Sequence, residues 1–177
     1  MLPLLVHEAV SNDILGRLAT QAILISGALS EQISRGMELS VTCSEDVPYL
    51  KTNAASADTL LGATFHEVLL ASCEAWPHGE VPPDFHAPVT AVVPVLLLSG
   101  ARDPVTPPAY ATATAAHFPN SQVLVAPGQG HSVSTHPCLR DIAAAFIDKG
   151  SLQGLDTSCV SKIAPAPFFT SILGPEP

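Results

Sequence analysis

The 177-residue sequence has few charged residues, and positive charges are the scarcest. Charged side chains make up 13% of the chain, and seven Lys and Arg stand against sixteen Asp and Glu, for a formal net charge of −9. Nucleic acids and anionic membrane surfaces are bound through basic patches, so the composition argues against both as partners. Uncharged or cationic small substrates remain compatible with it.

Long hydrophobic runs are also missing. No apolar run approaches the ~20 residues needed to cross a bilayer, so we expect no membrane span. The first residues, MLPLLVHEAVSND, have no Lys or Arg before the apolar stretch and no small-residue cleavage site, so we do not expect a signal peptide. Hydrophobic residues still make up 47% of the chain, which is typical of a globular domain with a real core.

Spacings typical of metal and redox sites do not occur. The seven histidines show no H-E-x-x-H pattern and the cysteines form no C-x-x-C pair, so we expect neither a metal nor another cofactor. The four cysteines permit two disulfides in three different pairings, and four buried free thiols are the alternative. These cysteines are Cys43, Cys73, Cys138 and Cys159.

The first part of the chain predicts helices. Apolar residues recur at helical spacing from Ser11 to Ile25, with a cap at Ser11 or Asn12. A short polar helix or turn is predicted from Leu29 to Glu38. A second long helix is predicted from Ser56 to Trp76, where the spacing includes Leu60 and Leu61. The segment PHGEVPPDFHAP then stops it, because proline interrupts helices.

The second part of the chain predicts strands that alternate with helices. Continuous apolar runs from Val92 to Leu98 and from Ser121 to Ala126 predict strands buried on both faces, as in a parallel sheet. Helices are predicted from Pro108 to Phe118 and from Cys138 to Lys149, and Gly150 is well placed as a left-handed stop. Strand, helix, strand and helix in this order predict a right-handed βαβ unit.

A carboxylate and an imidazole follow the two predicted strands. Asp103 comes shortly after the first strand in SGARDPVTPP, and His131 shortly after the second in APGQGHSVS. The carboxyl ends of parallel strands share one edge of a sheet, where catalytic groups gather in open α/β folds. We therefore expect Asp103 and His131 to lie within hydrogen-bonding distance. Such an Asp fixes the tautomer of a His that acts as general base and then as acid.

The same segments resemble a known family. VPVLLLSGARDPVTPP followed by LVAPGQGH is similar to the acid and histidine loops of α/β-hydrolases. Together with GMELSVTCSEDVP, CEAWP and the ending PAPFF, it resembles the tripeptidyl-aminopeptidase-like and proline-iminopeptidase-like serine hydrolases over roughly residues 1–170. The resemblance implies a mainly helical cap (lid) over residues 1–82. Residues 83–177 would then be the C-terminal part of a partial α/β-hydrolase core.

The resemblance also assigns roles. Asp103 corresponds to the acid and His131 to the base of a Ser-His-Asp triad. Cys138 and Cys159 correspond to a cysteine pair around the last helix, which leaves Cys43 and Cys73 as the second pair. It implies a secreted or periplasmic protein that acts on small peptide or ester substrates.

The sequence departs from that family in its nucleophile elbow, and the family's first strands and oxyanion-hole loop have no counterpart in it. Its enzymes carry the nucleophile on a G-x-S-x-G elbow before the cap, and this sequence contains no such pattern. We therefore expect a chain that corresponds to the C-terminal half, weak or inactive alone, and prone to self-association or to pairing with an N-terminal half. The function implied is that of a serine peptidase, aminopeptidase or esterase; the alternative is a non-catalytic remnant with a binding or structural role.

Three further residues are candidates. Ser132 lies in GHSVS, which comes closest to an elbow, but Ser134 replaces its final glycine. Glu45 and Asp46 have two interpretations: acids in the first turn of a helix capped by Ser44, or carboxylates that bind the α-ammonium of a substrate. Trp76 is expected to belong to the core of the cap.

Overall fold

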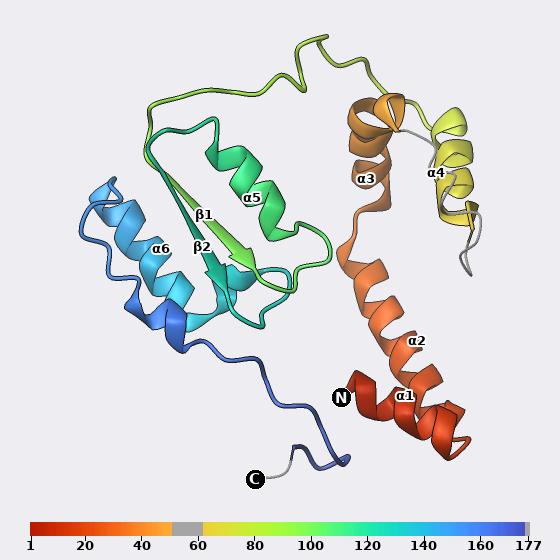
Figure 1. The fold of residues 1–177 in the computed structure, drawn as a ribbon. Coiled ribbons are helices and arrows are strands. Elements are labelled where there is room, and N and C mark those ends of the chain that lie inside the picture. Colours follow the sequence, from red (N-terminus) through yellow and green to blue (C-terminus); the bar gives the residue numbers. More distant parts are fainter. Residues whose placement is uncertain (51–61, 176–177) are drawn as a thin grey trace. The chain divides into compact units, whose positions relative to one another are not determined.

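The computed structural model describes residues 1–50 and 62–175, and the chain divides into two compact units, Met1–His86 and Ala87–Pro177 (Figure 1). The described part of the first unit is helical. The second unit combines helices with a parallel sheet, so the chain is a mixed α/β protein. No helix in the described ranges is long and apolar enough to cross a membrane.

The first unit begins with two helices, α1 (Leu2–Ser11) and α2 (Leu15–Gln32). The predicted helix start at Ser11 or Asn12 is wrong, and α1 was not predicted. Asp13 adopts a left-handed conformation with φ of 56°, and the amides of Asn12 and Ile14 both donate to the carbonyl of Glu8. Asp tolerates this conformation better than most residues, so Asn12 and Asp13 end one helix instead of starting the next.

Four more elements complete the described part of this unit. They are α3 (Arg35–Val41), the π-helical turn η1 (Thr42–Asp46), the 3-10 turn η2 (Val47–Tyr49) and α4 (Thr64–Ala75). The short element predicted from Leu29 to Glu38 is divided between α2 and α3. The predicted helix from Ser56 to Trp76 is described only in part. Its residues 56–61, which include Leu60 and Leu61, lie outside the described residues, and its second half is α4.

Trp76 and a disulfide join the end of α4 to α3 and η1 in this unit. The Cys43–Cys73 disulfide joins η1 to α4, and both cysteines are buried. The indole Nε1 of Trp76 donates to the hydroxyl of Ser40 at 3.0 Å, and its ring lies against Gly36. Trp76 therefore contributes to the packing of the first unit.

The second unit contains β1 (Val95–Gly100), α5 (Pro108–Ala115), β2 (Ser121–Ala126) and α6 (Pro137–Lys149). β1 and β2 pair in parallel, in register from Val95 with Ser121 to Gly100 with Ala126. This confirms the predicted strand–helix–strand–helix order. β1 begins at Val95 and not at Val92 because Pro94 has no N–H, whereas the amide of Val95 donates to Asn120.

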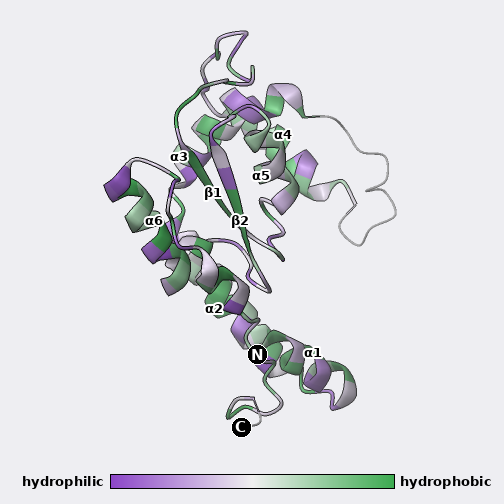
Figure 2. Ribbon diagram, turned by 60° about the vertical axis from the view of Figure 1, so that its left-hand side comes forward, coloured by the Kyte–Doolittle hydropathy of each residue, from purple (hydrophilic) through white to green (hydrophobic). Residues whose placement is uncertain are grey.

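The two helices lie on opposite sides of the sheet (Figure 1), whose strands are mainly hydrophobic (Figure 2). Gly150, with φ of 59°, ends α6 as predicted. The buried core lies on the α6 side and is formed by Leu124, Ala126, Val133, Leu139, Ile142 and Ile163. Burial of one such leucine or isoleucine contributes about 2 kcal/mol, so this core holds the carboxyl ends of both strands in place.

Candidate active site

The loops that follow β1 and β2 bring Asp103 and His131 together. Asp103 comes three residues after the end of β1 and His131 five residues after the end of β2. The Nδ1 atom of His131 lies 2.9 Å from the Oδ2 atom of Asp103. The predicted contact between the two residues is thus confirmed, since the parallel register places both strand ends at one edge.

Backbone contacts lock the two loops to each other. The amide of Ala101 donates to the carbonyl of Ala126 at 3.0 Å, and the amide of Arg102 donates to the carbonyl of Gln129 at 2.9 Å. A Cβ atom on Gly100 would lie 2.6 Å from the carbonyl oxygen of Gln129 and would clash with Gly130 as well. Only glycine fits at position 100, because the loop that carries His131 passes directly over it.

The carboxylate of Asp103 is buried and accepts several hydrogen bonds. The amides of Val105 and Thr106 donate to Oδ1 at 2.8 and 2.9 Å, and the hydroxyl of Thr106 donates to Oδ2 at 2.8 Å. The side chain is only 4% exposed. Burial alone would raise the pKa of Asp103, but the hydrogen bonds from Thr106, His131 and Val105 outweigh it and hold the pKa well below its usual range.

Thr106 is a third residue of the site, and its role was not predicted from the sequence. The sequence Asp103-Pro-Val-Thr106 could have predicted it. In a common type of turn, the side chain of an Asp accepts hydrogen bonds from the amides two and three residues later. The hydroxyl oxygen of Thr106 also lies 3.3 Å from Nδ1 of His131. The site is therefore a cluster of three side chains.

The imidazole of His131 faces a small open pocket. Its side chain is 52% exposed, and within the described ranges its Nε2 atom makes no hydrogen bond. An ionised Asp103 at Nδ1 favours the tautomer with the proton on Nδ1, which leaves a lone pair on Nε2. The pocket has a volume of about 210 Å³ and is lined by Leu98, Gly100, Asp103, Thr106, His131, Ser132, Val133 and Ser134.

Ser132 lies beside His131 in the same pocket. Its backbone is left-handed, with φ of 65° and ψ of 47°, and its carbonyl accepts a hydrogen bond from the hydroxyl of Thr135. Between the described residues, no hydrogen bond joins the hydroxyl of Ser132 to the ring of His131. The role of Ser132 as a nucleophile stays a prediction.

Glu45 and Asp46 lie in the π-helical turn η1 of the first unit. The interpretation of Ser44 as a helix N-cap is wrong, because α3 runs directly into η1 and no new helix begins there. The hydroxyl of Ser44 instead donates to the carbonyl of Ser40 at 2.7 Å and accepts from the amide of Gly79 at 3.1 Å. Binding of a substrate ammonium by these acids stays a prediction.

The four cysteines form the two predicted pairs. Besides Cys43–Cys73, a disulfide joins Cys138, at the start of α6, to Cys159. Across the part of the chain that the structure describes, no group of three or more His, Cys, Asp and Glu side chains could hold a metal ion.

Parallel strands with an Asp and a His on their carboxyl-end loops are consistent with a partial α/β-hydrolase fold. The sequence matches the family described as TAP-like protein over residues 58–159, more than half of the chain. The chain belongs to this family of α/β-hydrolases, which suggests a hydrolase-type function. No curated protein and no solved structure matches the sequence.

Proposed function

We propose that this chain supplies the acid and the base of a Ser-His-Asp triad in a hydrolase that cleaves peptide or ester bonds. The observation that carries the proposal is the 2.9 Å contact between His131 Nδ1 and Asp103 Oδ2. A general base requires a buried, hydrogen-bonded carboxylate on one side of a half-exposed ring and, on the other, an Nε2 that no described residue binds.

Each residue has a defined task in this proposal. Nε2 of His131 removes the proton of an attacking serine hydroxyl, whose oxygen bonds to the substrate carbonyl carbon. The imidazolium then returns the proton to the leaving amine or alkoxide as its bond to that carbon breaks. Asp103 stabilises the imidazolium and keeps the ring in the correct tautomer. Water repeats the sequence on the acyl-enzyme and restores the serine.

The nucleophile is proposed to come from a polypeptide segment other than these 177 residues. In support, the sequence contains no G-x-S-x-G pattern. Ser132 is the rival within this chain. Ser132 follows His131 directly in the sequence. To act as the nucleophile, its hydroxyl would have to reach the Nε2 side of the imidazole ring, where its proton is removed.

Peptides with a free N-terminus are the proposed substrates, and esters are the alternative. In support, Glu45 and Asp46 offer two neighbouring carboxylates in the unit proposed as the cap, and the whole chain carries a net charge of −9. The carbonyl of Glu45 is held by Nε2 of His86 at 2.8 Å, so the local backbone is fixed. A fixed backbone limits the positions that the two carboxylates can take, which lowers the entropic cost of binding an ammonium.

A fluorophosphonate probe tests the source of the nucleophile. We expect no stoichiometric serine labelling of the 177-residue chain, with Ser132→Ala and His131→Ala behaving like the wild type. Labelling at Ser132 that His131→Ala abolishes would place the complete nucleophile–base pair in this chain. Serine labelling that does not depend on His131 would contradict the proposed base and favour a non-catalytic role for the pair.

A further inference from the structure

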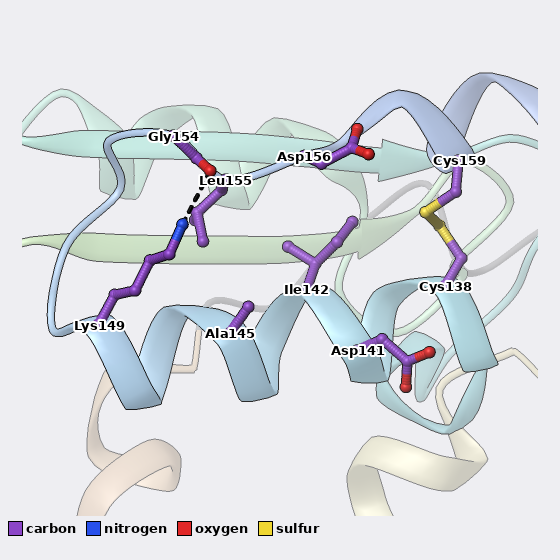
Figure 3. Close-up of a pocket in the computed structure, with 9 residues that line it drawn as sticks. All are labelled: Cys138, Asp141, Ile142, Ala145, Lys149, Gly154, Leu155, Asp156 and Cys159. Atoms are coloured by element: carbon purple, nitrogen blue, oxygen red, sulfur yellow. Dashed lines mark hydrogen bonds between the residues drawn. A yellow bond between two sulfur atoms is a disulfide. The ribbon is translucent and has the colours of Figure 1, made fainter.

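The segment after α6 folds back along that helix and is fixed to it at two points. Residues 154–165 are called the return segment here. The Cys138–Cys159 disulfide joins it to the first turn of α6, and Nζ of Lys149 donates to the carbonyl of Gly154 at 2.9 Å (Figure 3). Between these points, a cavity of about 410 Å³ separates helix and segment. These two contacts fix residues 154–159 of the return segment to α6.

Beyond the disulfide, the return segment reaches the loop that carries His131. Ile163 is buried in the core, where only 7% of its surface is exposed. The side-chain Nε2 of Gln129 donates to the carbonyl of Ala164 at 3.2 Å. A Cβ atom on Gly128 would lie 2.6 Å from the Cβ of Pro165. The return segment is thus in van der Waals contact with the backbone of this loop.

Gln129 connects the return segment to the acid loop as well. Its carbonyl accepts the amide of Arg102, one residue before Asp103, and its amide donates to the carbonyl of Ala126 at the end of β2. One residue thereby ties together the loop of Asp103, the strand before His131 and the return segment. It lies two residues before His131 in the sequence.

The return segment gives this loop an anchor in addition to its backbone contacts with the loop of Asp103. Gly128 and Gly130 flank Gln129, and glycine leaves the backbone more conformational freedom than any other residue. The ring of His131 is half exposed, and its hydrogen-bonding partners in the described ranges are Asp103 and Thr106 alone. The orientation of the ring therefore follows from the path of the loop backbone.

We propose that Gln129 is a positioning residue, which the return segment holds through Ala164 and the Cys138–Cys159 disulfide, and which keeps the ring of His131 against Asp103. The catalytic meaning of this role rests on the proposed function. The geometric role does not, because it concerns only where the imidazole lies.

The test uses the Nδ1 proton of His131, whose resonance lies far downfield when it is hydrogen-bonded to a carboxylate. Gln129→Met keeps the length of the side chain and removes the donor, and Gln153→Met is the matched control, since Gln153 is exposed. We expect the resonance in the wild type and in Gln153→Met and its loss in Gln129→Met, with the circular dichroism spectrum unchanged. An unchanged resonance in Gln129→Met would overturn the inference.

A second pair of variants decides the question if Gln129→Met does not fold. Cys138→Ala/Cys159→Ala frees the return segment, whereas Cys43→Ala/Cys73→Ala removes a disulfide of the other unit. We expect only the first to lose the resonance, and its retention there would refute the role of the return segment. A wild type without the resonance would contradict the Asp103–His131 contact itself, and with it the proposed function. A resonance that responds as expected in a chain without hydrolytic activity would sustain the positioning role alone.

Discussion

The hydroxyl of Thr106 donates a hydrogen bond to the same carboxylate oxygen of Asp103 that lies 2.9 Å from His131. The backbone amide of Thr106 binds the other oxygen, so this residue holds both oxygens of the carboxylate. Asp103 is thereby fixed in its ionised form and in the rotamer that faces the imidazole.

Replacing the hydroxyl of Thr106 tests this role. In Thr106→Val we expect ester hydrolysis by the chain to fall by about tenfold or less, as for the loss of one hydrogen bond to a charged acceptor. Thr106→Ser should restore the rate, because it restores the hydroxyl. Thr112→Val is the control, since among the residues that the structure describes that hydroxyl bonds only to the carbonyl of Pro108 in α5. Equal rates in the Val and Ser variants would refute the role.

The lowered pKa of Asp103 predicts a loss of stability in acid. A carboxylate whose folded pKa is depressed stabilises the folded chain fully above its unfolded pKa, near 3.9, and less as the pH falls towards the folded pKa. We expect urea unfolding to show a steep decline below about pH 4 in the wild type.

In Asp103→Asn the decline of stability in acid should be shallower. Part of the decline should remain, because hydrogen bonds from Ser158 also lower the pKa of Asp156. Asp148→Asn removes the same charge from an exposed position of α6 and serves as the control. If Asp103→Asn and Asp148→Asn follow the same curve as the wild type, the hydrogen-bonded carboxylate makes no net contribution.

Much of the second unit could be predicted from its sequence because its signals are local. The apolar run Ser121 to Ala126 is β2 itself, and Gly150 ends α6 where a left-handed residue is needed. The contact between Asp103 and His131 followed from the parallel order of two strands, which the intervening helix dictates.

Apart from Thr106, the features that were not predicted depend on contacts that leave no local pattern in the sequence. Asn and Asp are common at both ends of helices. Asn12 and Asp13 lie at the end of α1 here because the amides of Asn12 and Ile14 donate to the carbonyl of Glu8. The contact of Gln129 with Ala164 joins residues 35 positions apart and leaves no periodic trace. Thr106 was within reach of the sequence, since its spacing from Asp103 is that of a side-chain turn.

The Cys138–Cys159 disulfide joins residues 21 positions apart, which predicts a contribution of about 3 kcal/mol to the free energy of unfolding from loop entropy. Cys138→Ala/Cys159→Ala should lose about this amount in urea titrations, and peptide mapping without reduction should find the linked peptide in the wild type. Free thiols at both positions in protein from an oxidising compartment would show that the bond does not form.

Gly128→Ala tests the contact with Pro165. The substitution adds a Cβ at a positive φ of 68° and drives it into the return segment. Gly150→Ala is matched in conformation, with φ of 59°, but its Cβ would meet nothing within 4 Å. We expect Gly128→Ala to be the less stable of the two by roughly 1–3 kcal/mol, the usual cost of overpacking. Equal melting temperatures would mean that the loop moves away from Pro165 at no cost.

The central claim, that His131 is a general base held by Asp103, is tested most directly by the rate of p-nitrophenyl ester hydrolysis. Because the serine is proposed to lie outside these residues, the chain alone should hydrolyse the ester only slowly, with water activated by His131 as the nucleophile. After the rate in buffer has been subtracted, we expect His131→Ala to lose about tenfold or more of this slow rate, a modest part of what a positioned base contributes in a complete active site. Asp103→Asn should lose a smaller part, and His117→Ala, which changes another histidine of the same unit, should leave the rate unchanged. A wild-type rate equal to that of His131→Ala would contradict the claim.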